Sequence, residues 1–94
     1  MSSLSGAQKR ELKARAHHLK PVVMVGQKGL TPSLVSAVDK ALEDHELIKV
    51  KFIDFKDDKR DIAAEIAKAT KCELVDIIGN MAIFYREGED EGDL

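Results

Sequence analysis

Apolar positions recur along this 94-residue chain at two spacings, which predict helices alternating with strands. Apolar residues three or four positions apart indicate helices over residues 5–20, 32–44 and from Asp57 or Asp58 to about Thr70. Short apolar or alternating runs indicate strands over residues 22–25, 47–55, 72–78 and 81–86. The predicted order is therefore α-β-α-β-α-β-β.

Local signals mark the ends of these elements. Ser3 or Ser5 can cap the first helix, and Pro21 ends it because the residue before a proline avoids the α region. Thr31 is a good N-cap for the second helix, and Pro32 is suited to its first position. Gly79-Asn80 between two apolar runs predicts a hairpin.

This order predicts a single compact α/β domain with a mixed four-stranded sheet. Right-handed strand–helix–strand connections place the first three strands parallel, and the closing hairpin adds an antiparallel fourth. The domain spans residues 1–86. Residues 87–94 form an acidic, glycine-spaced tail that we expect to be disordered. The tail either solubilises the chain or screens a basic face from non-specific RNA.

One stretch carries a distinctive turn, Gly26-Gln27-Lys28-Gly29, between a strand and a helix start. Glycines let a backbone approach a phosphate closely, and a helix start supplies free N–H groups and a positive dipole end. The turn is too short for a Walker loop and lacks the dinucleotide triple glycine. It matches the Gly-x-x-Gly loop with which KH-type domains clamp RNA, although paired glycines alone also serve purely structural turns.

Charge is distributed unevenly, although the formal net charge is only −2. Residues 1–30 carry six bases against Glu11 alone, a balance of +5, and residues 87–94 carry five acids and no base. Within the predicted first helix, one arc is free of acids and holds Lys9, Arg10, Lys13, His17 and Lys20. A solvated helix face is the plain interpretation of this arc; its single sign favours an RNA-binding one.

Composition argues against an enzyme. Aromatic residues make up 4% of the chain and Trp is absent, which disfavours a deep ligand pocket. Cys72 is the only cysteine and is expected to be an inert buried thiol, and the adjacent His17 and His18 diverge on a helix. Asp57-Asp58 is more readily a helix cap than a catalytic pair. We expect no cofactor and no metal site.

No signal peptide or membrane helix is apparent in the sequence, so the expected location is the cytoplasm. We expect a monomer that does not associate with membranes.

Four segments in order resemble the CRM domain (chloroplast RNA splicing and ribosome maturation), specifically its stand-alone YhbY subfamily. They are Leu19-Lys20-Pro21-Val22-Val23, Val25-Gly26-Gln27-Lys28-Gly29-Leu30-Thr31, His45-Glu46-Leu47-Ile48-Lys49-Val50-Lys51, and Ile78-Gly79 followed by Phe84-Tyr85-Arg86. The resemblance covers about residues 4–86. It implies an RNA-binding fold like the C-terminal domain of bacterial translation initiation factor 3, and association with precursor large ribosomal subunits during assembly. The acidic tail lies outside it.

The leading hypothesis is an RNA-binding module that contacts the RNA backbone. Its predicted contact residues are Gly26, Gln27, Lys28, Gly29, Lys9, Arg10, Lys13 and Lys20, with Lys49, Lys51 and Arg86 as weaker candidates. The alternative is a protein-interaction module that docks on ribosomal particles, for example on ribosomal proteins, without direct RNA contact. A small hydrolase using Asp57, Asp58 and a histidine is a third hypothesis, which the spacing does not favour.

Overall fold

A computed structural model describes residues 4–88 of the chain, and its secondary structure follows the predicted order. The elements are α1 (Gly6–Ala16), β1 (Val23–Val25), α2 (Pro32–His45), β2 (Leu47–Phe52), the 3₁₀ turn η1 (Lys56–Asp58), α3 (Lys59–Thr70), β3 (Glu73–Ile78) and β4 (Met81–Tyr85). Residues 89–94 of the predicted tail lie outside the described residues. Gly88, at its near end, donates its backbone N–H to Glu46 Oε2 at 2.7 Å.

The starts of α1 and α2 form as their sequence signals predict. Ser5 caps α1 in a capping box: its hydroxyl accepts the Gln8 N–H, and the Gln8 side chain accepts the Ser5 N–H. Thr31 caps α2 by accepting the Leu34 N–H at 3.0 Å, with Pro32 at the first helical position.

The sheet has the strand order β1-β2-β4-β3. β1 pairs parallel with β2, and β4 pairs antiparallel with both β2 and β3. The first three strands therefore run in one direction, as predicted. The fourth strand lies between β2 and β3, a position that the sequence pattern did not specify, and β1 is an edge strand.

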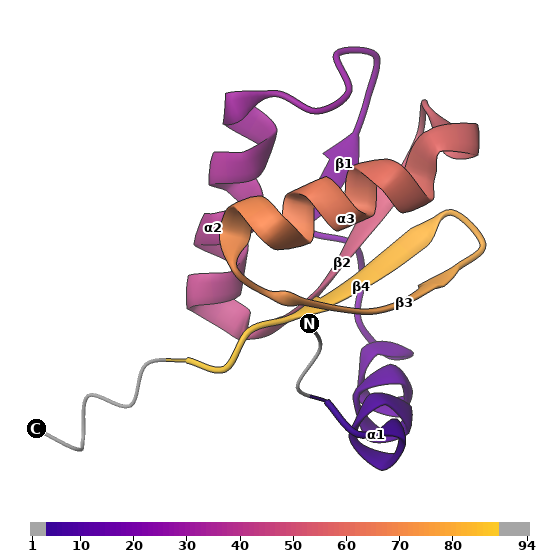
Figure 1. The fold of residues 1–94 in the computed structure, drawn as a ribbon, viewed down its shortest axis with the longest axis vertical. Coiled ribbons are helices and arrows are strands. Elements are labelled where there is room, and N and C mark those ends of the chain that lie inside the picture. The colour runs from indigo at the N-terminus through magenta and orange to yellow at the C-terminus, as the bar shows by residue number, and fades with distance from the viewer. Residues whose placement is uncertain (1–3, 89–94) are drawn as a thin grey trace, which may run out of the picture.

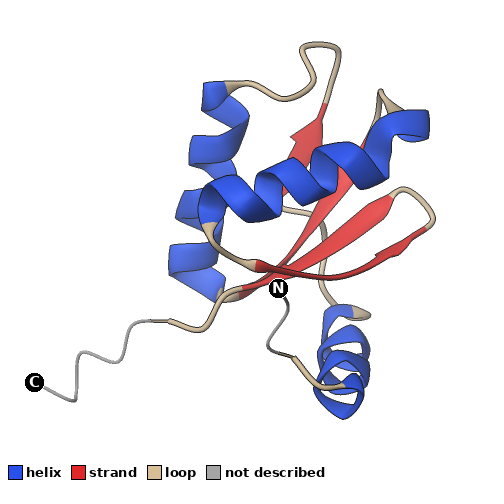
Figure 2. Cartoon of the chain, viewed as in Figure 1, coloured by secondary structure: helices blue, strands red, loops and turns tan. Residues whose placement is uncertain are grey.

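Helices cover both faces of the sheet (Figures 1 and 2). α2 and α3 pack on the face that carries Ile48, Val50 and Phe52 of β2, where the main core lies. α1 packs on the opposite face, in a smaller cluster formed by Leu12, Ala16, Leu47, Val75 and Ile83. No helix among residues 4–88 is long and apolar enough to cross a membrane.

Two predicted boundaries were wrong. α1 ends at Ala16, four residues before the predicted end, because the chain turns there: Leu19 donates to the Ala16 carbonyl at 2.9 Å and leads toward β1. β2 ends at Phe52 instead of residue 55. The backbone N–H groups of Ile53 and Asp54 both donate to the Val25 carbonyl, at 2.9 and 3.1 Å, which folds this segment over the end of β1.

Candidate nucleic-acid interface

The Gly26–Gly29 segment is a tight turn between β1 and α2. The Gly29 N–H donates to the Gly26 carbonyl at 3.0 Å, and Gly29 has a φ of 63°. This left-handed backbone favours glycine, because a Cβ would crowd the following carbonyl. Gln27 and Lys28, between the two glycines, are both exposed. The sequence-predicted strand–turn–helix arrangement is confirmed.

A second reason for glycine at position 29 comes from Phe55, which lies 26 residues away in the sequence. A Cβ placed on Gly29 would lie 3.1 Å from Phe55 Cε2 and 3.4 Å from its Cζ. By contrast, a Cβ on Gly26 would meet nothing within 4 Å. The Phe55 ring therefore packs against the turn at Gly29.

The turn and the start of α2 present several backbone donors. The N–H groups of Lys28, Leu30 and Ser33 make no backbone hydrogen bond among those found in the turns and caps of residues 4–88. The Leu34 N–H is already held by Thr31. Free N–H groups at a helix start, together with the dipole, form a favourable environment for an anion such as a phosphate.

A shallow groove runs beside this turn, between β1 and the first turns of α2. Its walls are formed by Val22, Val23, Met24, Gly26, Gln27, Lys28, Gly29, Thr31, Ser33, Leu34 and Ala37. Met24 and Val22 are about half exposed, at 54% and 51%. The groove thus combines half-exposed apolar side chains with the residues of the glycine turn.

Lys49 and Lys51 lie on the sheet face that α1 partly covers. They alternate with the buried core residues of β2 and share their face with Leu47, which packs under α1. At its other end, β2 places Phe52 beside Val25, the residue before the glycine turn. The two lysines thus lie between α1 and the turn. Lys51 is exposed and Lys49 is half-buried.

The basic helix does not adjoin the turn. α1 lies at the opposite end of the long axis from the segment between β1 and α2 (Figure 1). Arg10 is exposed and Lys9 is half-buried on α1, whereas Lys20 is exposed in the connection that follows it. The predicted single arc from Lys9 to Lys20 is therefore wrong, because the helix stops before Lys20.

Lys13 is engaged within the domain. Its Nζ lies 2.9 Å from Asp76 Oδ2 on β3, where a register irregularity between Leu74 and Asp76 interrupts the ladder. The hydrogen bond from Lys13, assisted by the Ile77 N–H, holds the pKa of Asp76 below its ordinary value. Part of the Lys13 charge is thus neutralised, so Lys13 is a weaker candidate for an RNA contact.

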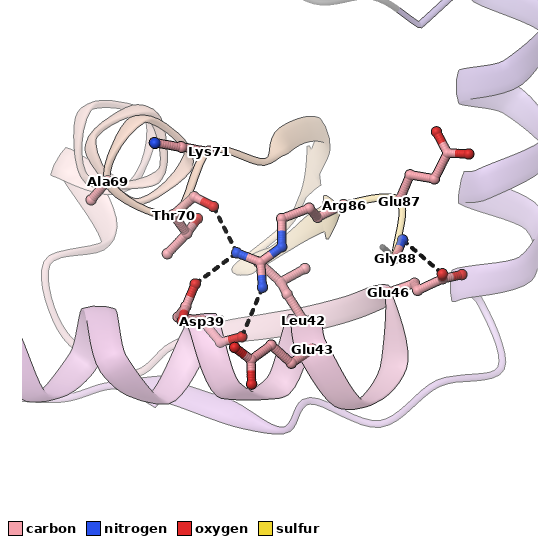
Figure 3. Close-up of a pocket in the computed structure, with 10 residues that line it drawn as sticks. All are labelled: Asp39, Leu42, Glu43, Glu46, Ala69, Thr70, Lys71, Arg86, Glu87 and Gly88. Atoms are coloured by element: carbon pink, nitrogen blue, oxygen red, sulfur yellow. Dashed lines mark hydrogen bonds and ion pairs between the residues drawn. The ribbon is translucent and has the colours of Figure 1, made fainter. Parts of the chain in front are cut away.

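Arg86 also forms internal contacts (Figure 3). Its guanidinium donates to Asp39 Oδ1 at 2.6 Å, to the Asp39 carbonyl at 3.1 Å and to the Thr70 carbonyl at 2.8 Å. These bonds join β4 to α2 and α3 in a hollow that is also lined by Glu43, Glu46 and Glu87. The acidic surroundings and the internal bonds do not suit a phosphate contact.

The residues of the hydrolase hypothesis come from separate elements: Asp57 and Asp58 from η1, the adjacent His17 and His18 from the segment after α1, and His45 from the end of α2. Asp58 occupies the N-cap position of α3, although its side chain makes no capping bond. His17 and His18 contact each other edge to face, with ring centroids 5.5 Å apart. Within residues 4–88, no three His, Cys, Asp or Glu side chains are grouped closely enough to hold a metal ion.

Cys72 is half-buried immediately before β3, and burial raises the pKa of its thiol above the ordinary value. The Thr70 hydroxyl donates to the Ile66 carbonyl at 2.8 Å and lies 3.1 Å from Cys72 Sγ. A thiol with a raised pKa stays protonated at neutral pH, as a structural cysteine does.

These features define a small α/β domain whose turn exposes Gln27 and Lys28 beside a helix start, an arrangement that can contact a polyanion. The family model of the CRS1/YhbY (CRM) domain matches residues 4–86 of this chain. The chain belongs to this family of RNA-binding proteins.

Named relatives agree with this assignment. The chain is 42% identical over 86 residues to "Probable RNA-binding protein PA4753" of Pseudomonas aeruginosa, covering 90% of this chain and 83% of that one. It is 39% identical over 88 residues to "Probable RNA-binding protein YqeI" of Bacillus subtilis, covering 93% and 92% of the two chains. The solution structure of the Staphylococcus aureus hypothetical protein SAV1595 superposes with a TM-score of 0.81 at 37% identity, covering 97% and 96%.

Proposed function

We propose that this chain binds RNA mainly through the sugar-phosphate backbone, with the Gly26–Gly29 turn as the primary contact. One observation carries the proposal: the turn exposes Lys28 and unpaired backbone N–H groups at the start of α2, in a chain of an RNA-binding family. A phosphate at this position accepts hydrogen bonds from the backbone and is attracted by Lys28 and the helix dipole. Such contacts give affinity with modest sequence preference.

The proposed contact surface continues from the turn along β2 toward α1. Lys51 and Lys49 lie on this path, which covers about 17 Å for a six-residue strand. Lys20, Arg10 and Lys9 extend the positive charge at the α1 end. The turn and the basic helix thus lie at the two ends of an extended contact surface and do not form one small site. Arg86 is left out of the proposed surface, and Lys13 contributes less than the exposed lysines.

The proposed RNA is ribosomal RNA in precursors of the large subunit, and the proposed role is assistance in subunit assembly in the cytoplasm. Membership of the CRM family supports this proposed role, because the domain is named for ribosome maturation as well as RNA splicing. The proposal predicts that the protein co-sediments with large-subunit precursors and is released when the particles are treated with nuclease. Retention after complete RNA digestion would instead favour docking on ribosomal proteins.

Direct binding is tested with purified protein and a labelled fragment of large-subunit RNA. The affinity should fall steeply with salt, with a logarithmic slope of about −0.7 for each phosphate neutralised on a single strand. Salt-independent binding, or no binding at low salt, would contradict a backbone-directed mode.

A further inference from the structure

Phe55 is the one exposed Phe or Tyr side chain among residues 4–88. Among the Phe and Tyr side chains of residues 4–88, Phe52 and Phe84 are fully buried and Tyr85 packs against the α1 cluster. Phe55 retains 43% of its surface accessible to solvent. Its ring nevertheless has a fixed neighbour, because Cδ2, Cε2 and Cζ lie within 3.5 Å of the position where a Gly29 Cβ would stand.

The backbone holds this ring in place at some energetic cost. Phe55 has φ 59° and ψ 36°, a left-handed conformation that is uncommon for a bulky residue. The segment is anchored on both sides: Ile53 and Asp54 donate to the Val25 carbonyl, and the Phe55 carbonyl accepts the Asp58 N–H at 3.0 Å. Strained positions of this kind persist when their surroundings determine them, and they cluster at ligand-binding sites.

The position of the ring indicates which chemical group of a bound RNA it would contact. It lies against the turn that is proposed to hold a phosphate, with Lys28 in that turn and Lys56 as the next residue in the chain, both exposed. A nucleotide whose phosphate meets the turn carries its base only a sugar away. An exposed aromatic ring at that distance offers a surface on which an unpaired base stacks.

We propose that Phe55 is a stacking platform for one unpaired nucleobase of the bound RNA, placed beside the phosphate contact of the Gly26–Gly29 turn. This proposal rests on the proposed function and refines it: the preferred ligand is RNA with an unpaired nucleotide, such as a loop or a single strand. The ring then supplies a contribution that salt does not screen, in addition to the lysine contacts that salt weakens.

The test compares a short single-stranded RNA with a strand of the same length and charge that lacks its bases. The wild-type protein should bind the strand with bases roughly 5- to 150-fold more tightly, the range expected for one base on a protein ring. Phe55→Leu keeps an apolar side chain against Gly29 and should lose this preference while still binding the abasic strand. Ile53→Ala, at a neighbouring residue that is 48% exposed, serves as the control and should retain the preference.

A second variant gives an optical signal. The chain has no tryptophan, so Phe55→Trp introduces a single reporter. Its fluorescence should be quenched by the strand with bases and remain unchanged with the abasic strand. The stacking proposal would be overturned if Phe55→Leu kept the preference for the strand with bases, or if it bound both strands equally more weakly than the wild type. It would also be overturned if the two strands changed the Trp fluorescence equally. These outcomes would leave the proposed phosphate contact standing. Failure of wild-type protein to bind either strand would overturn the proposed RNA contact itself.

Discussion

The Arg86 guanidinium lies 2.6 Å from the Asp39 carboxylate, a contact that ties the end of β4 to the middle of α2. The same guanidinium also donates to the Thr70 carbonyl at the end of α3. Three elements that are far apart in the sequence therefore meet at one side chain, which is only 23% exposed. Arg86, a basic residue at the end of the domain, thus stabilises the fold.

Replacing Arg86 by Ala should lower the free energy of unfolding by about 1–2 kcal/mol, because a charged hydrogen-bond network is removed while Asp39 can be rehydrated. Arg86→Lys should recover only part of the lost free energy, since an ammonium cannot reproduce the forked hydrogen-bond geometry of the guanidinium. Urea unfolding measures both values. RNA affinity, measured where the variants are folded, should stay near that of the wild type; a large drop in affinity with unchanged stability would place Arg86 in the RNA-binding surface.

The two glycines of the turn should respond differently to a methyl group. Gly29→Ala should cost about 1–2 kcal/mol, because of its positive φ and the proximity of the Phe55 ring. Gly26→Ala is the matched control in the same turn, where a Cβ meets nothing and stability should change by less than about 0.5 kcal/mol. Thermal unfolding of the pair measures the difference, and equal costs would rule out the conformation described for Gly29.

The Lys13–Asp76 pair should make stability depend on pH. Because Lys13 lowers the pKa of Asp76 in the folded state, the pair stabilises the fold above the ordinary carboxyl pKa of about 3.9, and this contribution disappears as the pH falls through the lower folded value. Asp76→Asn should therefore be less stable than wild type at neutral pH, with the difference shrinking in acid. Urea unfolding at several pH values measures it; a difference that grows in acid would contradict the assigned pairing.

Cys72 should be a slow nucleophile. Since burial raises its pKa, the thiol should react with iodoacetamide at neutral pH more slowly in the folded protein than after unfolding in urea. A raised thiol pKa stabilises the protonated folded form, so this contribution is complete below the ordinary pKa and disappears as the pH rises through the folded value. Faster alkylation in the folded state would contradict this description.

Local signals in the sequence predicted the turn and its neighbouring helix well. Thr31, Pro32 and the two glycines specify a cap, a first helical residue and a turn within a few positions of one another. Strand directions also followed from element order. By contrast, the end of α1 was predicted from Pro21 and from the helical spacing of Leu12, Ala16 and Leu19, whereas the turn at Ala16 depends on how the chain must reach β1.

The remaining features depend on residues that are distant in the sequence. The basic helix and the glycine turn are neighbours along the chain, yet they lie at opposite ends of the molecule (Figure 1). Conversely, the partners of Lys13 and Arg86 are distant in the sequence and close in space: Asp76 comes from β3 and Asp39 from α2. Phe55 was assigned to a strand because the run from Leu47 to Phe55 alternates and is rich in β-formers. Its left-handed backbone beside Gly29 has no signal in the local pattern.

Charge reversal in the turn tests the primary RNA contact most directly. Gln27→Asp combined with Lys28→Asp should leave the fold intact and reduce affinity for a large-subunit RNA fragment more than tenfold at low salt. The salt slope should become shallower by about 0.7 for each phosphate that the variant no longer neutralises. Ala64→Asp with Lys68→Asp makes the same charge change on exposed positions of α3 and should have a much smaller effect. Equal weakening by the two double variants, or undiminished binding by the turn variant, would contradict a site at Gly26–Gly29.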